Sequence, residues 1–531
     1  MFFNRVNGKC RVLKQTKQTV AAVAILPLLG LATVARAELK AASLFSDHVV
    51  LQQGIPLSIW GTGDVGSKAT LRFAGQTVDG LVTESGTWRV QLEPLQANAQ
   101  GEDLIVSDGH TQQVIGDVLV GEVWLAAGQS NMQMTTQSMV KKLPEAAAMI
   151  EAANRSAIRC LRIDEAVADG RRADFKRAAT WKVCDAKTVS SFSAVAWVFA
   201  RRLQMDLAVP VGIIDVSWGG KPIEPFIPGE DFQRHPLLET IKKLADQDQL
   251  DALAMIEGGV VIRNPEGYPG AIYDARIRPM AGCGLRGFIW YQAESNCGTG
   301  EDPRGYRHKM EALVDSWRRA WDNPHLPFYY VQLPKYKKEA FGWIYMRDEQ
   351  RRALAIANTG MAVTIDTGSD DVHPANKVDM GERLALLALN RTYHKSVVDS
   401  GPLYQSHTVT GAVVTVTFSH ADSGLIVASK IGLAKPQEIP DQTIPHFELA
   451  GADGQWFPAQ ARIVGKTVQV SSQQVSTPKA VRYACLNNPQ DGLLYNREGL
   501  PASPFCSKLA WLPWRDPSKP VSYTHLRAHE T

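Results

Sequence analysis

The stretch "VWLAAGQSNMQM", residues 123–134, places a serine directly after an apolar run. Residues 123–127 are typical of a buried strand, and the turn that ends the strand carries Ser130. Strands often end in Gly and Ser because these residues make turns, and Ser130 could also simply cap a following helix. The serine indicates chemistry only if the rest of the chain supplies a base and oxyanion donors.

The sequence around this stretch predicts the fold. Between about residues 117 and 400, apolar runs such as "VGIIDVSWGG", "LRGFIWYQAES" and "PFYYVQL" alternate with helix-like stretches such as "SAVAWVFARRLQ" and "HKMEALVDSWRRAW". Buried strands that alternate with amphipathic helices predict a three-layer α/β/α domain with a mainly parallel sheet. Short alternating strands before and after it predict an N-terminal β domain over residues 38–116 and a C-terminal β-sandwich domain over residues 401–515.

The two ends of the chain differ from these domains. Residues 1–37 combine a basic leader, an apolar run and the small-x-small pattern Ala35-Arg36-Ala37, which predicts a signal peptide cleaved before Glu38. An uncleaved signal anchor is the alternative, but the apolar run is short for a membrane span and contains Pro27. Residues 516–531 show no apolar periodicity and are predicted to be an unstructured tail. We therefore expect an exported protein, periplasmic or secreted, with no membrane contact after cleavage.

Charge and cysteine usage fit this expectation. The first 37 residues hold six of the 57 Lys and Arg and no Asp or Glu, so the remainder carries 51 basic and 54 acidic residues. This balance makes nucleic acid an unlikely partner. Six cysteines remain, and an exported chain can keep disulfides. The proximal pairings would be 160–184, 283–297 and 485–506, with buried free thiols as the alternative.

Polar clusters follow four of the predicted strands, and the carboxyl ends of strands in an open α/β sheet form the ligand-binding edge. Ser130 is the candidate nucleophile, and His373 in "SDDVHPANK" is the candidate base. An acid three residues before a histidine can fold back onto Nδ1, which favours Asp370, with Asp371 as an alternative. Two aspartates beside one histidine could also suggest a metal, but no second His or Cys lies at ligand spacing, so neither a metal nor a cofactor is expected.

The same clusters supply candidate oxyanion donors and sugar contacts. Backbone N–H groups of Ser130 and of Gly219-Gly220, and the side-chain amides of Gln292 or Asn296, could converge on one oxygen. The candidate substrate-binding residues are Gln129, Trp218, Glu294 and Arg347. Several of these candidates have a simpler interpretation. Gly219 and Gly220 could form an ordinary turn, Glu294 could be a buried structural acid, and Arg347 could be a charge on a helix surface.

Several motifs in family order resemble the sialate O-acetylesterase family, a branch of the SGNH-type esterases. They are "LFSDHVVLQQGIPLSIWG", "GEVWLAAGQSNMQM", "DVSWGGKPIEPF", "GFIWYQAESN", "DDVHPANK" and "NREGLPASPF", and they cover nearly the whole mature chain. The resemblance implies an SGNH-hydrolase-like core and a serine esterase that removes O-acetyl groups from sugars. It also implies roles for Ser130 as nucleophile, His373 as base, and Gly220 with the amide of the "WYQAESN" block as oxyanion donors. Ala293 stands where the family usually has Gly, which could crowd the rim of the site.

The resemblance leaves the substrate open between O-acetylated sialic acid, which we favour, and acetylated xylan or another polysaccharide. A sialate pocket would present an Arg to the sugar carboxylate, for which Arg347 is a candidate. A polysaccharide cleft would present exposed aromatic side chains, for which Trp218 and Trp343 are candidates. A sugar-binding protein with a decayed esterase site is a further alternative, and the intact Ser130 and His373 argue against it. A lipase of the α/β-hydrolase fold is disfavoured because "GQSNM" lacks the GxSxG elbow.

Overall fold

The structure is a computed structural model that describes residues 38–168, 170–234, 238–239, 268–297, 303–337, 342–368, 370–440, 443–490 and 492–512. The predicted signal peptide and the predicted tail lie outside these residues. Within these ranges, no helix is both long enough and apolar enough to cross a membrane.

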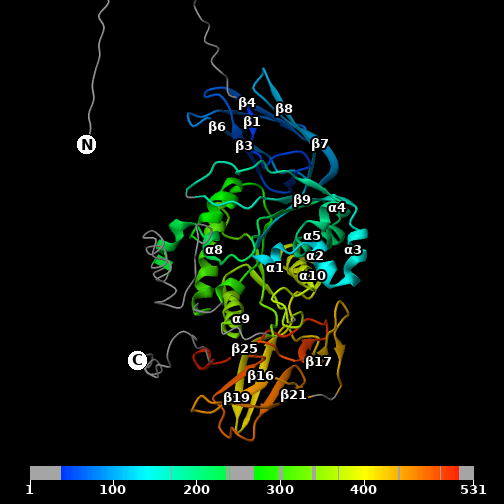
Figure 1. Cartoon of the computed structure of the whole chain (residues 1–531), viewed down its shortest axis with the longest axis vertical. Coiled ribbons are helices and arrows are strands. Elements are labelled where there is room, and N and C mark those ends of the chain that lie inside the picture. Colours follow the sequence, from blue (N-terminus) through cyan, green and yellow to red (C-terminus); the bar gives the residue numbers. More distant parts are fainter. Residues whose placement is uncertain are drawn as a thin grey trace, which may run out of the picture. The chain divides into compact units, whose positions relative to one another are not determined.

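A mixed sheet with helices lies at the centre of the described chain, and β8 (Gln112–Gly128) runs through it (Figure 1). The strand order is β10-β9-β11-β8-β12-β13-β14, and every neighbouring pair is parallel except β10 with β9. The chain order reverses at β8, which has β11 on one side and β12 on the other, and such a point is where open α/β sheets bind ligands. The other strands of this path are β9 (Arg155–Arg162), β10 (Lys182–Cys184), β11 (Val211–Asp215), β12 (Gly287–Tyr291), β13 (Phe328–Val331) and β14 (Thr359–Ala362).

Both faces of this sheet are buried, which explains why its strands read as continuous apolar runs. In β12, Phe288 and Trp290 pack edge-on against Trp317 of α8. Their neighbours in the strand, Ile289 and Tyr291, belong to a second core cluster that includes residues of α5 and α10. The helices of the described chain are α1 (Ser130–Gln133), α2 (Thr136–Lys142), α3 (Ala147–Glu151), α4 (Ala186–Ser190), α5 (Ala194–Leu207), α8 (Tyr306–Ala320), α9 (Trp343–Arg352) and α10 (Lys377–Leu387).

Four of the N-terminal strands, β2, β4, β5 and β7, are continuous with the central sheet through β8, whereas β1, β3 and β6 form a separate three-stranded sheet. Strand β8 begins at Gln112 among the N-terminal strands and ends at Gly128, so the domain boundary predicted at residue 116 falls inside a strand. Its first half pairs with β7 and β2, and its second half pairs with β11 and β12. The N-terminal strands are β1 (Lys40–Ala41), β2 (Val50–Gln52), β3 (Leu57–Thr62), β4 (Lys68–Phe73), β5 (Gln76–Leu81), β6 (Thr87–Leu92) and β7 (Asn98–Ser107).

The region after residue 400 forms short, mostly antiparallel strands in three small sheets. Its alternating residues build a core cluster of their own, which includes Val414, Val416 and Phe418 from one strand. The strands are β15 (Leu403–Thr410), β16 (Val413–Ser419), β17 (Leu425–Ser429), β18 (Gln437–Glu438), β19 (Phe447–Ala450), β20 (Trp456–Pro458), β21 (Gln460–Val464), β22 (Thr467–Ser471), β23 (Ala480–Tyr483), β24 (Leu493–Asn496) and β25 (Phe505–Cys506). The exact domain boundaries stay predictions.

All six cysteines of the described chain are free and buried, so none of the three predicted disulfides is formed in the structure. Cys283 precedes β12 and Cys297 follows it, whereas the 160–184 and 485–506 pairings join neighbouring strands or their ends. All three pairings stay predictions.

Candidate active site

The turn after β8 is shaped by the close approach of a neighbouring strand. Gly128 has a φ of +133°, and a Cβ at this position would lie 2.0 Å from the carbonyl oxygen of Tyr291 in β12. The next residue, Gln129, donates its backbone N–H to that same oxygen at 2.9 Å. Only glycine fits here, and it allows the chain to turn into α1 with Ser130 as the first helical residue.

Ser130 and His373 meet at the carboxyl edge of the sheet although 243 residues separate them. The Nε2 atom of His373 lies 2.8 Å from the Ser130 hydroxyl oxygen. The alternative role of Ser130 as a helix cap is wrong, because Gln129 occupies the cap position and makes no side-chain cap hydrogen bond. A half-buried serine hydroxyl paired with an imidazole is the arrangement of an activated nucleophile and its base.

The acid beside His373 is Asp371 and not Asp370. One oxygen of Asp371 accepts the His373 backbone N–H at 2.9 Å and lies 3.5 Å from His373 Nδ1. Asp370 points elsewhere: its carboxylate pairs with Lys337 at 2.8 Å, and 72% of its side chain is exposed. The prediction of Asp370 is therefore wrong in this geometry. Asp371 reaches the ring although it lies only two residues before His373. The chain between them forms a tight turn, which is closed by the hydrogen bond from the His373 backbone N–H to the Asp371 side chain.

The electrostatics of this pair suit a base that is neutral near pH 7. Lys142, which pairs with the Asp371 carboxylate, lowers the pKa of that acid, and the His373 backbone N–H lowers it further. Burial lowers the pKa of His373, and the positive charge of Lys377 lowers it further, while Asp371 opposes them. The imidazole is therefore free to accept a proton under physiological conditions.

The loop after β11 lies against the nucleophile turn. The backbone N–H of Trp218 donates to Gly128 O at 2.9 Å, and a Cβ on Gly219 would lie 3.5 Å from the Cβ of Ser130. Gly219 donates its backbone N–H to the side-chain oxygen of Gln133 at 2.9 Å. Gly220 has a φ of +71° and open space around its Cα. Among the described residues, none accepts a hydrogen bond from the Gly220 backbone N–H, which stays a candidate oxyanion donor, whereas the N–H of Gly219 is engaged.

Arg276 stabilises the loop after β11 through hydrogen bonds to backbone carbonyls, and this residue was not predicted from the sequence. Its side chain is fully buried and donates to the carbonyl oxygens of Val216 at 2.7 Å and Ile163 at 2.5 Å. It thereby joins the segments that follow β11 and β9. The residue lies in a π-helical turn, Tyr273–Ile277, a feature that is frequent at functional sites. No periodicity signal distinguishes such an arginine from a surface charge.

The two side-chain amides predicted as oxyanion donors do not face the site. Gln292 is fully buried, and its amide nitrogen donates to Gln129 Oε1 at 3.0 Å and to Asn296 Oδ1 at 2.7 Å. Asn296 is also fully buried, accepts the Ile223 backbone N–H at 2.9 Å and donates to Glu224. Both predictions are wrong because these amides are engaged in a buried network. The methyl group of Ala293 lies in the core and does not crowd the rim.

A second buried network, also missed from the sequence, lies under the catalytic pair. Asn131, the residue after Ser130, donates to the backbone oxygen of Val372 at 2.9 Å and to the Glu294 carboxylate, and it accepts from Lys377. Burial raises the pKa of Glu294 and lowers that of Lys377 to about 7. Glu294 is thus the buried structural acid of the alternative interpretation, and Asn131 ties the nucleophile turn to the His373 loop.

The remaining predicted sugar contacts have different outcomes. Arg347 is fully buried and donates to the carbonyl oxygens of Pro334, Leu486 and Asn487. It is therefore neither a substrate contact nor a charge on the helix surface. Trp343 is 2% exposed and offers no open stacking face. Trp218 is half-buried, with the Lys221 ammonium 4.9 Å from its ring centroid, and stays a candidate.

Gln129 is 3% exposed, and its side-chain oxygen already accepts from Gln292 and from the Ser295 backbone N–H. Its assignment as a sugar contact stays a prediction. Within the described ranges, no three His, Cys, Asp or Glu side chains are grouped so that they could hold a metal ion.

A serine hydroxyl and an imidazole held together at the carboxyl edge of an α/β sheet define a candidate hydrolase. Residues 120–390 match the family described as carbohydrate esterase, sialic acid-specific acetylesterase. The chain belongs to this family and is a carboxylic ester hydrolase, an O-acetylesterase of sugars.

Relatives resemble the chain over most of its length. Sialate O-acetylesterase of Mus musculus is 26% identical over 88% of this chain and 94% of its own length. The human sialate O-acetylesterase is 27% identical over 87% of this chain and 91% of its own. The crystal structure of a carbohydrate acetylesterase from Xanthomonas citri is 30% identical, with a TM-score of 0.77 over 89% of this chain and all of the other.

Proposed function

We propose that the esterase uses Ser130 as nucleophile, His373 as general base and Asp371 as the acid that orients the imidazole. The observation that carries this assignment is the 2.8 Å contact between His373 Nε2 and the Ser130 hydroxyl, with Asp371 on the other side of the ring. The proposed framework is a three-layer α/β/α core of the SGNH-hydrolase type, supported by parallel strands that reverse order at β8 and by helices packed on both faces.

The reaction follows from the geometry in two acyl-transfer steps. His373 Nε2 takes the hydroxyl proton while Ser130 Oγ attacks the acetyl carbonyl carbon, and the carbonyl oxygen becomes an oxyanion. We assign the backbone N–H groups of Ser130 and Gly220 as the donors that receive it. The tetrahedral intermediate expels the sugar oxygen, which takes the proton from His373, and an acetyl-Ser130 ester remains. Water, deprotonated by His373, then hydrolyses this ester to acetate and restores the hydroxyl.

The proposed substrate is O-acetylated sialic acid. Sialate O-acetylesterases of mammals match nearly the whole chain, which supports this choice over acetylated xylan. The burial of Trp343 removes one of the two aromatic side chains that a polysaccharide cleft was expected to expose. Export through the predicted signal peptide is part of the proposal, and it rests on the sequence of residues 1–37 alone.

Covalent labelling and acetate release test the catalytic assignment together. The protein is treated with an organophosphate, and peptide mass spectrometry locates the adduct, which we expect on Ser130. Ser130→Ala should neither label nor release acetate, and its free energy of unfolding should change by about 1 kcal/mol or less. If Ser130→Ala retains more than about 1% of the wild-type turnover, Ser130 is not the nucleophile. A parallel panel of 9-O-acetyl sialic acid and acetylated xylo-oligosaccharides tests the substrate.

A further inference from the structure

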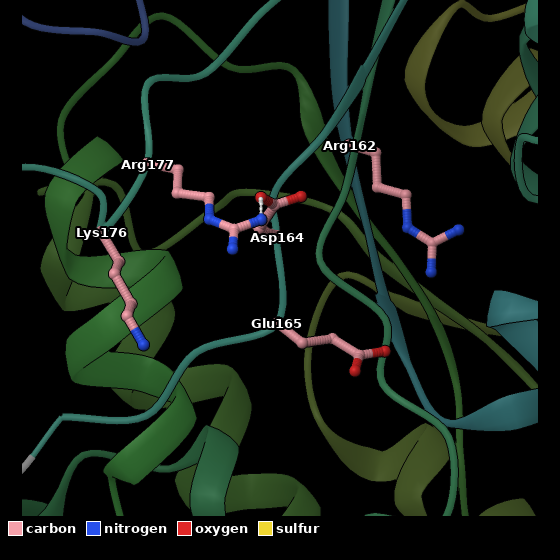
Figure 2. A pocket seen from close by; sticks show the side chains of 5 residues that line it. All are labelled: Arg162, Asp164, Glu165, Lys176 and Arg177. Carbon is pink, nitrogen blue, oxygen red and sulfur yellow. Dashed lines mark hydrogen bonds and ion pairs between the residues drawn. The ribbon is translucent and has the colours of Figure 1, made fainter.

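An open cavity of about 380 Å³ is lined by five charged and exposed residues: Arg162, Asp164, Glu165, Lys176 and Arg177 (Figure 2). Arg162 ends β9 at the carboxyl edge of the sheet, and the other four follow on the chain between β9 and β10. The volume lies in the range of small-ligand sites and is sufficient for one sugar unit. None of the lining side chains is aromatic.

A short series of contacts joins this cavity to Ser130. The side-chain amide of Gln133 donates to Glu165 at 2.5 Å, and its oxygen accepts the backbone N–H of Gly219 at 2.9 Å. Gln133 lies on α1 three residues after Ser130, so the two side chains lie on neighbouring parts of the same helix surface. Gln133 therefore connects Glu165, at the wall of the cavity, to the helix and the loop that flank Ser130.

The charges in the cavity are unequally paired. Asp164 accepts from Arg177 at 3.2 Å, and Figure 2 shows this pair joined by a dashed line. Glu165 is engaged by Gln133. Arg162 and Lys176 form no ion pair with any residue in the described part of the chain, and Figure 2 places them on opposite sides of the view. Because Gln133 is neutral, Glu165 keeps its negative charge, and the three positive and two negative lining side chains give a net charge of +1. This net positive charge favours an anion, and Arg162 and Lys176 are the cations whose charge is not already paired.

We propose that this cavity is a subsite for the carboxylate of an acidic sugar, with Arg162 as its principal partner. The planar guanidinium of an arginine binds a carboxylate through two parallel hydrogen bonds, and Lys176 contributes positive charge to the lining at a distance from Arg162. Arg162 takes the role that sequence reasoning gave to Arg347, which is buried and bonded to backbone carbonyls. The inference rests on the proposed function and adds the part of the site that selects sialate.

The test compares 9-O-acetyl sialic acid with its methyl ester, which keeps the acetyl group and the sugar but lacks the negative charge. We expect the wild-type protein to show a higher kcat/KM for the acid than for the ester. The ratio of the two kcat/KM values should fall about tenfold or more in Arg162→Ala, with partial recovery in Arg162→Lys. The matched control is Arg172→Ala, an exposed arginine of the same segment that does not line the cavity, and it should keep the wild-type ratio.

Equal kcat/KM values for acid and ester in the wild type, or an unchanged ratio in Arg162→Ala, would overturn the subsite. An O-acetylated uronic acid oligosaccharide in the same panel separates the two sources of carboxylate: dependence on Arg162 with that sugar alone would assign the subsite to uronates. Acetate release from p-nitrophenyl acetate, which carries no sugar carboxylate, measures the catalytic residues alone. It therefore separates failure of the subsite from failure of the proposed function. Ser130-dependent release without any acid preference overturns the subsite only, and release that survives Ser130→Ala overturns the catalytic assignment.

Discussion

The turn after β12 and the loop that carries His373 both bring polar side chains to the same edge of the sheet, yet they differ in burial. In the β12 turn, Gln292 and Asn296 are fully buried and bonded to other protein groups. In the histidine loop, Asp371 and His373 are both more than a third exposed at the side chain. A polar cluster after a strand can therefore either stabilise the fold or take part in the reaction. Solvent access and unused hydrogen-bonding capacity distinguish the two, whereas position in the sequence does not.

The largest expected effect comes from the exposed loop. Replacing His373 by Ala removes the base that accepts the Ser130 proton, so kcat should fall by about a thousandfold or more. Because the imidazole is half-exposed, the free energy of unfolding should change by about 1 kcal/mol or less. Steady-state turnover of an acetyl ester, together with a denaturant titration, measures both. A variant that keeps a tenth of the wild-type kcat would show that another group is the base.

A smaller effect is expected in the pH profile. Only neutral His373 can accept a proton, so kcat/KM should fall with decreasing pH through the pKa of His373. Burial and Lys377 lower this pKa, which places the midpoint of the acid limb below 6.5. The negative charge of Asp371 favours the imidazolium, so Asp371→Asn should move the midpoint to still lower pH and Asp370→Asn should leave it in place. A midpoint above 6.5 in the wild type would contradict this electrostatic account.

The smallest effect on turnover is expected in the buried turn. In Asn296→Ala, the Ile223 backbone N–H and Glu224 lose buried partners, which should lower the free energy of unfolding by about 2 kcal/mol. The kcat of the folded fraction should stay within about threefold of the wild type, since Asn296 does not face Ser130. A hundredfold loss of kcat at unchanged stability would instead restore Asn296 as an oxyanion donor.

Much of the fold could be predicted from the sequence because strands buried on both faces give an unmistakable apolar pattern. "GFIWYQ" is one case, with Phe288 and Trp290 facing one core and Ile289 facing the other. The continuity of β8 across residue 116 could not be predicted, because one long strand pairs with two sets of partners and nothing in its composition marks the change.

The meeting of Ser130 with His373 could also be predicted, since Ser130 follows β8 directly and His373 lies in the polar segment between β14 and α10. The direction in which individual side chains point could not be predicted from the sequence. Asp370 and Asp371 differ only in how the turn presents them, and Arg347 resembles any arginine on a helix until its packing is known. Arg276 and Gln133 were missed for the same reason, because each acts through backbone groups that lie 59 residues or more away in the sequence.

We propose that Asp371 orients His373 against Ser130 while its neighbour Asp370 does not. The kcat values of Asp371→Asn and Asp370→Asn on one acetyl ester, each with a thermal unfolding control, test this assignment. The two substitutions are chemically identical and adjacent, so any difference reports on position alone. We expect a loss of about a hundredfold or more for Asp371→Asn and less than about threefold for Asp370→Asn. An equal or greater loss for Asp370→Asn would contradict the account, and so would losses below tenfold in both variants, which would indicate a catalytic dyad without an acid.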